Sequence, residues 1–260
     1  MINLTKMENE IMNNEENKTA TVAVMINPKG GTAKSTTSIN LALYLVSQGY
    51  EVLFVDADVQ KTGCKTFAKR EELGLICPVV AEKTNGLARF IDHMKSSFDF
   101  IVIDTQGADS NVTRDALAVA DWSFTPFSYT GFDVNELGTV VDWVLKAQSF
   151  NKNLISFFLP SMVIKQRTAV KRVERNKAEA NILKAIEIAG YENVAPAELN
   201  IHLLKTEISL NAEYTKMDAG KSVFELTKGK TLTPMLEYLS LLNETVEIVN
   251  GKEINNKEVA

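Results

Sequence analysis

A glycine-rich segment near the N-terminus, residues 29–35 (KGGTAKS), combines the residue types that bind phosphate. It follows an apolar run at residues 21–26 and leads into an apolar helical pattern. A loop between a strand and a helix points backbone N–H groups at an anion, and the helix dipole favours negative charge there. Lys34 would reach the β- and γ-phosphates, and the Ser35 hydroxyl would ligate Mg²⁺. The segment therefore predicts a nucleoside-triphosphate site.

Two further apolar runs end in carboxylates, as a magnesium–nucleotide site requires. Residues 52–55 lead into Asp56 and Asp58, and residues 100–103 lead into Asp104. A carboxylate at the end of a buried strand is costly unless positive charge lies near it, and Mg²⁺ or a lysine would supply that charge. Asp104 would hold Mg²⁺ through water, because magnesium keeps several of its waters when it binds to protein carboxylates.

Strand and helix patterns alternate along the chain, which predicts a parallel sheet covered by helices. Several runs are apolar at successive positions, as in strands buried on both faces. The expected fold is one doubly wound, mostly parallel α/β sheet, with ligands beyond the carboxyl ends of the strands. The predicted strands are 21–26, 51–56, 78–81, 98–104, 122–127, 154–163 and 200–205. The predicted helices are 35–48, 112–120, 133–149, 169–189 and 234–249.

The composition is that of an ordinary globular protein, with 45% of the 260 residues hydrophobic and 23% charged. The net charge of −5 means that any nucleic-acid contact needs a local basic patch. Two cysteines, Cys64 and Cys77, are too few for a disulfide scaffold and are expected to be reduced thiols. No apolar stretch is long enough for a bilayer and no secretory pattern opens the chain, so we expect a cytoplasmic protein.

One domain is expected over residues 20–250, with a short segment on either side. Residues 1–19 are rich in Asn and Glu with little periodicity and are expected to be a flexible tail. Residues 251–260 are expected to be a polar tail. They offer no apolar stripe with a basic face, so no membrane contact is expected there.

The phosphate-binding segment departs from the common pattern G-x-x-x-x-G-K-[ST], because Pro28 and Ala33 stand at the glycine positions. It matches K-G-G-x-x-K-[ST] instead and resembles the deviant Walker A motif of the ParA/MinD superfamily, the SIMIBI class of P-loop proteins. Residues 56–60 (DADVQ) resemble the family's D-x-D-P-Q motif, and residues 98–107 (FDFIVIDTQG) resemble its Walker B strand. Weaker likenesses follow at ADWSFTP and GKSVFE, so the resemblance covers about residues 21–249.

This resemblance implies roles for individual residues. Lys29 would cross a dimer interface and touch the other subunit's nucleotide, while Asp58 would orient or activate the attacking water. Ala33 must fit one methyl group where most members have glycine, which is expected to affect hydrolysis more than binding. The expected catalytic residues are Lys29, Lys34 and Asp58. The expected ATP-binding residues are Lys29, Gly30, Gly31, Thr32, Ala33, Lys34, Ser35, Thr36 and Gly107, and the expected Mg²⁺ residues are Ser35, Asp56 and Asp104.

A basic segment, residues 165–177 (KQRTAVKRVERNK), carries six positive residues and one negative residue in an acidic chain. By itself it would fit a solvated helix with long cationic side chains. In ParA proteins, however, dimers bind DNA non-specifically through basic residues of the C-terminal half, and such a contact needs only a basic face. Lys171, Arg172 and Arg175 could share one helical face. The expected DNA-binding residues are Lys165, Arg167, Lys171, Arg172 and Arg175.

The resemblance implies a partition or positioning ATPase. ATP would close a homodimer, the dimer would bind nucleoid DNA non-specifically, and a ParB-like or adaptor protein would stimulate slow hydrolysis. The cargo would be a plasmid, a chromosome origin or a protein assembly. Two alternatives remain open: a P-loop metabolic ligase resembling dethiobiotin synthetase, and an accessory ATPase for conjugative DNA transfer. Substrate-dependent turnover without DNA would indicate the first, and sequence-specific DNA binding the second.

Overall fold

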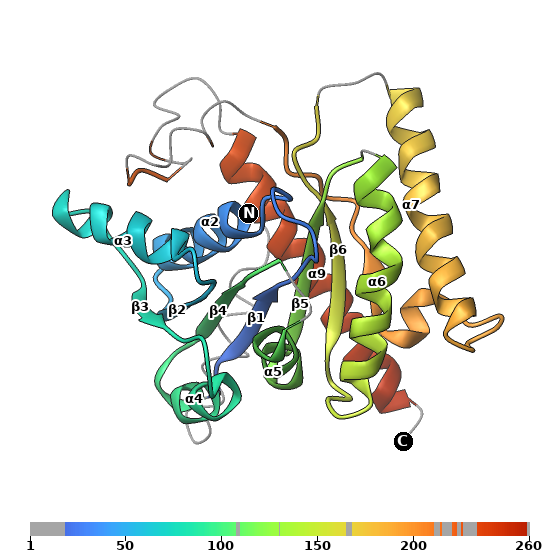
Figure 1. Ribbon diagram of the computed structural model, residues 1–260, viewed down its shortest axis with the longest axis horizontal. Coiled ribbons are helices and arrows are strands. Elements are labelled where there is room, and N and C mark those ends of the chain that lie inside the picture. The colour runs from blue at the N-terminus through green and yellow to red at the C-terminus, as the bar shows by residue number, and fades with distance from the viewer. Residues whose placement is uncertain are drawn as a thin grey trace.

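A parallel β-sheet forms the centre of the protein (Figure 1). The computed structural model describes residues 19–107, 110–129, 131–164, 168–210, 214, 220–222, 225 and 233–258, with the backbone alone described at 131–135, 168–169 and 252–258. Within these ranges seven strands pair in the order β3-β2-β4-β1-β5-β6-β7, every neighbour parallel. The strands are β1 Thr21–Met25, β2 Val52–Ala57, β3 Val79–Glu82, β4 Phe100–Thr105, β5 Trp122–Phe127, β6 Ile155–Pro160 and β7 Ile201–Leu203.

Helices cover both faces of this sheet, and each face has its own hydrophobic core. On one face pack α4, α5, α6 and α7; on the other pack α2, α3 and α9, and Figure 1 shows α6 in front of the strands and α9 behind them. The helices are α2 Lys34–Ser47, α3 Thr62–Glu72, α4 Leu87–Met94, α5 Asn111–Val119, α6 Gly131–Gln148, α7 Thr168–Ile188 and α9 Thr233–Glu258, with 3₁₀ turns η1 Lys95–Ser97 and η2 Pro196–Leu199. The predicted doubly wound α/β fold is confirmed.

The strand sequences follow from this double cover. All residues of β2, β4, β5 and β6 are buried, because both faces of these strands meet a helix layer. In β1, Val22 and Val24 belong to one core while Ala23 and Met25 belong to the other, as the alternation of side chains along a strand requires. The strand β1 is thus buried on both faces in the middle of the sheet, and the glycine-rich loop follows it.

Two helices and several boundaries differ from the sequence-based expectation. The helices α3 and α4 were not predicted, because α3 buries a single large apolar side chain, Phe67, and α4 is only eight residues long. The predicted strand 154–163 ends at Pro160, with an isolated bridge from Val163 to Ser209 beyond it.

The C-terminal segment also needs correction. Residues 251–258 were expected to be part of a polar tail, yet they continue α9 as far as Glu258. One glycine inside a helix, here Gly251, costs only about 1 kcal/mol and does not end it. The expected tail at residues 1–19 lies outside the described residues apart from Thr19. Where the chain is described, no helix has the length and apolarity to cross a bilayer.

Candidate nucleotide-binding site

A cavity of about 480 Å³ opens at the carboxyl ends of the central strands. This volume lies in the range of small-molecule and cofactor sites. One end is formed by the loop after β1, the start of α2 and the loops after β2 and β4; the other end is formed by the segments after β6 and β7. The first end is lined by Gly30, Gly31, Ala33, Lys34, Ser35, Thr36, Thr37, Asp58, Gln60 and Gly107, and the second by Met162, Ile208, Ser209, Leu210 and Tyr214.

The glycine-rich loop is held by Asn27, two residues before it, and contains residues with left-handed backbone conformations. The buried side chain of Asn27 donates to the carbonyl of Pro126 at 2.9 Å and accepts from the N–H of Lys29 at 2.9 Å. Gly31 has φ 75°, a conformation that favours glycine. Ala33, directly before α2, has φ 70° and ψ 23°, so it too occupies the left-handed region that favours glycine. The methyl group of Ala33 therefore lies at a strained position.

The two lysines of the loop lie in different environments. Lys34 is 7% exposed, and its Nζ donates to the carbonyl of Lys29 at 2.8 Å. Burial lowers the pKa of Lys34, while the nearby charges of Asp104 and Asp58 act in the opposite direction. Lys29 itself is exposed. The buried lysine therefore faces the acids of the site, as a phosphate-binding lysine must, and the exposed lysine is placed for another task.

Gly107 lies against this lysine. A Cβ atom there would lie 3.0 Å from Lys34 Nζ and 3.2 Å from the carbonyl oxygen of Pro28. A side chain at position 107 would therefore push Lys34 out of place. The structure thus brings Gly107 directly to Lys34, the lysine that the sequence predicts to bind phosphate.

Asp104 is the acid that fits a divalent cation. It is fully buried, and neither carboxylate oxygen has a hydrogen-bond partner among the described residues. Burial raises the pKa of Asp104 to about 7; Asp56 and Asp58 add to this, while Ser35 and Lys34 oppose it. Such an orphaned carboxylate suits an oxygen-binding cation. Asp104 and Ser35 would hold Mg²⁺, which when bound would neutralise charge on the phosphates.

Asp56 is occupied by the protein backbone instead. Its Oδ1 accepts from the N–H of Asp58 at 3.2 Å, and its Oδ2 accepts from the N–H of Cys64 at 2.9 Å. Asp56 thus ties the loop after β2 to the first turn of α3. Its expected part in the Mg²⁺ shell stays a prediction, while its structural part is the placement of Asp58.

Asp58, the expected catalytic acid, is half-buried in the cavity wall. Its Oδ1 accepts from the N–H of Gln60 at 2.9 Å, and its carbonyl accepts from the N–H of Lys61 at 3.0 Å. A carboxylate held in this way near a buried lysine can orient a water molecule beside a phosphate. Of the other expected ATP-binding residues, Thr36 lines the cavity and Thr32 is buried, with its hydroxyl donating to the Lys29 carbonyl at 3.3 Å.

Sequence reasoning missed the apolar end of the cavity. Met162, Ile208, Leu210 and Tyr214 line it, from segments that follow β6 and β7. An apolar wall at the end of the cavity away from the glycine-rich loop suits a nucleotide base. No motif marks these residues. The one available signal was that Ile208, Leu210 and Tyr214 follow the carboxyl end of a predicted strand, whereas Met162 fell inside the predicted strand 154–163.

The basic helix does not present its cations as one exposed face. Lys171 pairs with Glu207 at 2.6 Å. Arg175 donates to the carbonyls of Leu204 and Leu203 at 2.6 and 2.9 Å. Arg172 is exposed. Lys165 and Arg167 lie outside the described residues. Of the three expected DNA-binding residues that the structure describes, Arg172 therefore keeps the clearest access to a partner.

The sequence is similar to those of known proteins. Among curated proteins, the chain is similar to protein virC1 of Rhizobium rhizogenes, with 27% identity over 62% of this chain and 70% of that one. It is also similar to the chromosome-partitioning ATPase Soj of Thermus thermophilus, with 28% identity over 39% of this chain and 52% of that one.

Solved structures share the fold at lower identity. A Cyanothece McdA–ATP complex superposes with a TM-score of 0.60 at 18% identity, covering 87% of this chain and 97% of that one. The ParA of pNOB8, bound to nonspecific DNA, superposes with a TM-score of 0.58 at 16% identity, covering 89% and 99%. The family model for the ATPase MipZ matches residues 21–186, which is more than half of the chain. This protein is therefore an ATPase of the MipZ family, within the ParA/MinD superfamily.

Proposed function

We propose that this ATPase binds Mg·ATP in the cavity, closes into a homodimer in that state, and binds DNA non-specifically as the dimer. Hydrolysis, stimulated by a ParB-like or adaptor protein, then releases the DNA and moves a cargo. The cargo would be a plasmid, a chromosome origin or a protein assembly, and the protein would be nucleoid-associated. The observation that carries the proposal is the division of the loop lysines into a buried Lys34 and an exposed Lys29.

The dimer follows from the exposed lysine. The backbone of Lys29 serves its own site, since its carbonyl accepts from Lys34 Nζ. Its side chain lies at the surface beside the cavity, where a second subunit could bring its nucleotide. This position supports the role in the partner's site that the motif resemblance implies.

Two observations support the DNA contact. Arg172 is exposed, and the ParA of pNOB8, which has a similar fold, is bound to nonspecific DNA in its structure. An exposed arginine can contact the phosphate backbone of DNA without reading bases. Such binding releases counterions, so it weakens steeply as salt rises.

The test is light scattering with ADP, ATP or a slowly hydrolysed analogue, each with and without random-sequence duplex DNA at two salt concentrations. Three variants accompany the wild type. Lys34→Ala should lose ATP affinity, while Lys29→Ala, its matched control in the same loop, should bind ATP and stay monomeric. Asp58→Ala should bind ATP, dimerise and remain on DNA because turnover stops.

ATP-dependent dimers that bind DNA and lose it at raised salt would support the proposal. A nucleotide-indifferent monomer that ignores DNA would overturn it. In that case, turnover that depends on a small carboxylic or amine substrate would indicate the ligase-like alternative. Binding confined to one DNA sequence would indicate the accessory role in DNA transfer.

A further inference from the structure

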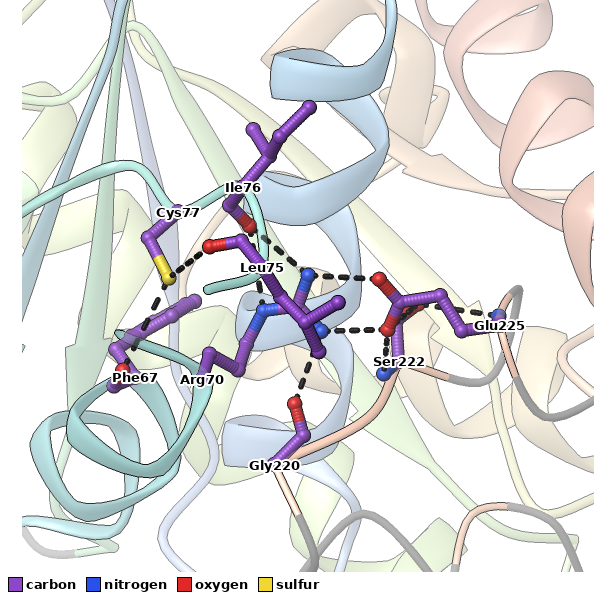
Figure 2. Close-up of polar contacts among 8 residues, drawn as sticks. All are labelled: Phe67, Arg70, Leu75, Ile76, Cys77, Gly220, Ser222 and Glu225. Atoms are coloured by element: carbon purple, nitrogen blue, oxygen red, sulfur yellow. Dashed lines mark hydrogen bonds and ion pairs between the residues drawn. The ribbon is translucent and has the colours of Figure 1, made fainter. Parts of the chain in front are cut away.

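Arg70, near the end of α3, is buried at 2% exposure although its guanidinium is charged. Figure 2 shows how its donors are used. Nε and Nη2 donate to the carbonyl of Ile76 at 3.3 and 2.9 Å, and Nη1 donates to the carbonyl of Gly220 at 2.9 Å. Nη1 and Nη2 also donate to the two carboxylate oxygens of Glu225 at 2.6 and 3.0 Å. A buried arginine is tolerated when its fork is satisfied in this way.

The partners of Arg70 on the other side are Gly220 and Glu225, and Gly220 packs directly against α3. Gly220 has φ 81°, and a Cβ there would lie 3.0 Å from Lys69 Cβ and 3.2 Å from the backbone nitrogen of Arg70. The N–H and hydroxyl of Ser222 both donate to Glu225 Oε2, at 2.7 and 3.0 Å. Burial favours the neutral acid, but the Arg70 guanidinium and the Ser222 donors hold the pKa of Glu225 below its usual value.

The opposite end of α3 is fixed to the end of β2, directly before the loop that carries Asp58. The N–H of Cys64, in its first turn, donates to Asp56 Oδ2 at 2.9 Å. At Gly63 the helix meets β2 so closely that a Cβ would lie 2.2 Å from the Phe54 ring. The helix begins four residues after Asp58. A displacement of α3 would therefore displace Asp58.

The bonds of Arg70 therefore hold the end of α3 to Gly220 and Glu225. The start of the same helix is held to Asp56, directly before the loop that carries Asp58.

We propose that Arg70 is a positioning residue for ATP turnover, which holds α3, and with it Asp58, in place by joining this helix to Gly220 and Glu225. Arg70 does not line the cavity, so it acts through the residues that do. The proposal rests on the proposed ATP site, and it adds a determinant that none of the nucleotide motifs contains.

The test uses the full-length Arg70→Lys and Glu225→Gln variants, their double variant, and Asp142→Asn as control. The control removes one partner of an exposed ion pair, Lys146–Asp142, on a helix of the other sheet face. The steady-state kcat and KM for ATP hydrolysis and the melting temperature are measured for each variant. Arg70→Lys keeps the charge but loses the fork, and Glu225→Gln keeps the shape but loses the charge.

Each single variant should lower kcat by about tenfold with KM changed less than threefold, which is the signature of lost orientation in the transition state. The double variant should be no slower than the slower single variant, since both break the same interaction. Asp142→Asn should match the wild type. Variants that melt earlier but turn over normally below their melting temperatures would overturn the inference and leave the ATP site standing. An inactive wild type would overturn the proposed function and the inference together.

Discussion

The buried carboxylate of Asp104, near Lys34, lowers the stability of the metal-free protein. Both oxygens are buried without a hydrogen-bond partner among the described residues. A group in this condition destabilises the folded state wherever it is ionised. It therefore offers a direct test of the site that needs no nucleotide.

Asp104→Asn should change how stability depends on pH in metal-free buffer. The pKa of Asp104 is raised from 3.8 to about 7, so the folded protein keeps a proton that the unfolded chain loses. The free energy of unfolding should then fall as pH rises from about 4 to about 7 and level off above that. The variant cannot ionise and should lack this fall. At pH 8 it should be more stable than the wild type, by at most about 4 kcal/mol.

Urea unfolding at pH 4 to 8 measures the difference. Glu187→Gln, at an exposed acid of α7, is the control and should follow the wild-type curve. Parallel curves of unfolding free energy against pH for the wild type and Asp104→Asn would show that Asp104 does not have a raised pKa in the folded protein. Adding Mg·ATP should stabilise the wild type and not Asp104→Asn, because the amide cannot supply the charge.

Ala33→Gly should stabilise the protein. At φ 70°, the methyl group of Ala33 crowds the following carbonyl, at a cost of about 1 kcal/mol that glycine avoids. The control is Ala180→Gly, at an exposed position inside α7, which should destabilise by about 1 kcal/mol because glycine weakens a helix interior. Opposite signs in denaturant unfolding are the expected result. A loss of stability in both variants would show that Ala33 is not strained.

At the scale of the secondary-structure elements, α3 depends on a glycine. A Cβ at Gly63 would lie 2.2 Å from Phe54 Cε1 and 3.1 Å from Asp56 Oδ2, so Gly63→Ala must push α3 away from β2. We expect a loss of about 1–3 kcal/mol in stability, as for overpacked cores. We also expect slower ATP turnover, because Asp58 moves with the helix.

Gly138→Ala in α6 is the matched change, since its Cβ would make an ordinary contact 3.5 Å from Ala185. It should be neutral or slightly stabilising, because alanine favours a helix. Thermal unfolding and ATPase assays of both variants decide the matter. Equal behaviour of the two would show that α3 tolerates displacement.

How much the sequence predicted can be judged at this scale. All seven strands of the described residues were predicted. For β2, β4, β5 and β6 the reason is burial on both faces, which leaves continuous apolar runs such as that of β4. The helix α3 was missed because it is held by Phe67 and by the polar bonds of Arg70 rather than by an apolar stripe. Patterns detect periodic burial, and α3 has little of it.

The candidate site divides in the same way. The sequence placed the end lined by the glycine-rich loop, since its residues sit in short segments whose spacing is fixed by local geometry, and their roles in binding phosphate stay predictions. The apolar end was not placed, because Ile208 and Tyr214 reach it only through the packing of segments far apart in sequence. Likewise, the basic helix gave no sign that Lys171 and Arg175 are engaged by Glu207 and by backbone carbonyls, which lie about 30 residues away.

For the whole molecule, the proposed DNA contact is a question of local against net charge. Arg172→Glu should weaken binding of random duplex DNA and reduce the slope of log affinity against log salt by about 1. Lys152→Glu makes the same change in net charge in the exposed loop before β6, at the end of the sheet opposite the cavity, and should have little effect. Fluorescence anisotropy at several salt concentrations, with ATP analogue present, measures both. Equal losses would show that net charge rather than this helix governs binding.

The order of strands in the sheet also bears on how the protein is made. The first strand, β1, lies between β4 and β5. Its end is held by the hydroxyl of Thr105, which donates to the carbonyl of Met25 at 2.6 Å, and the loop that follows is held by the carbonyl of Pro126. At a synthesis rate of about 5–20 residues per second, these partners leave the ribosome roughly 5–20 s after the loop itself. A nascent chain therefore carries its glycine-rich loop for roughly a third of its synthesis before the partners that hold the loop are available.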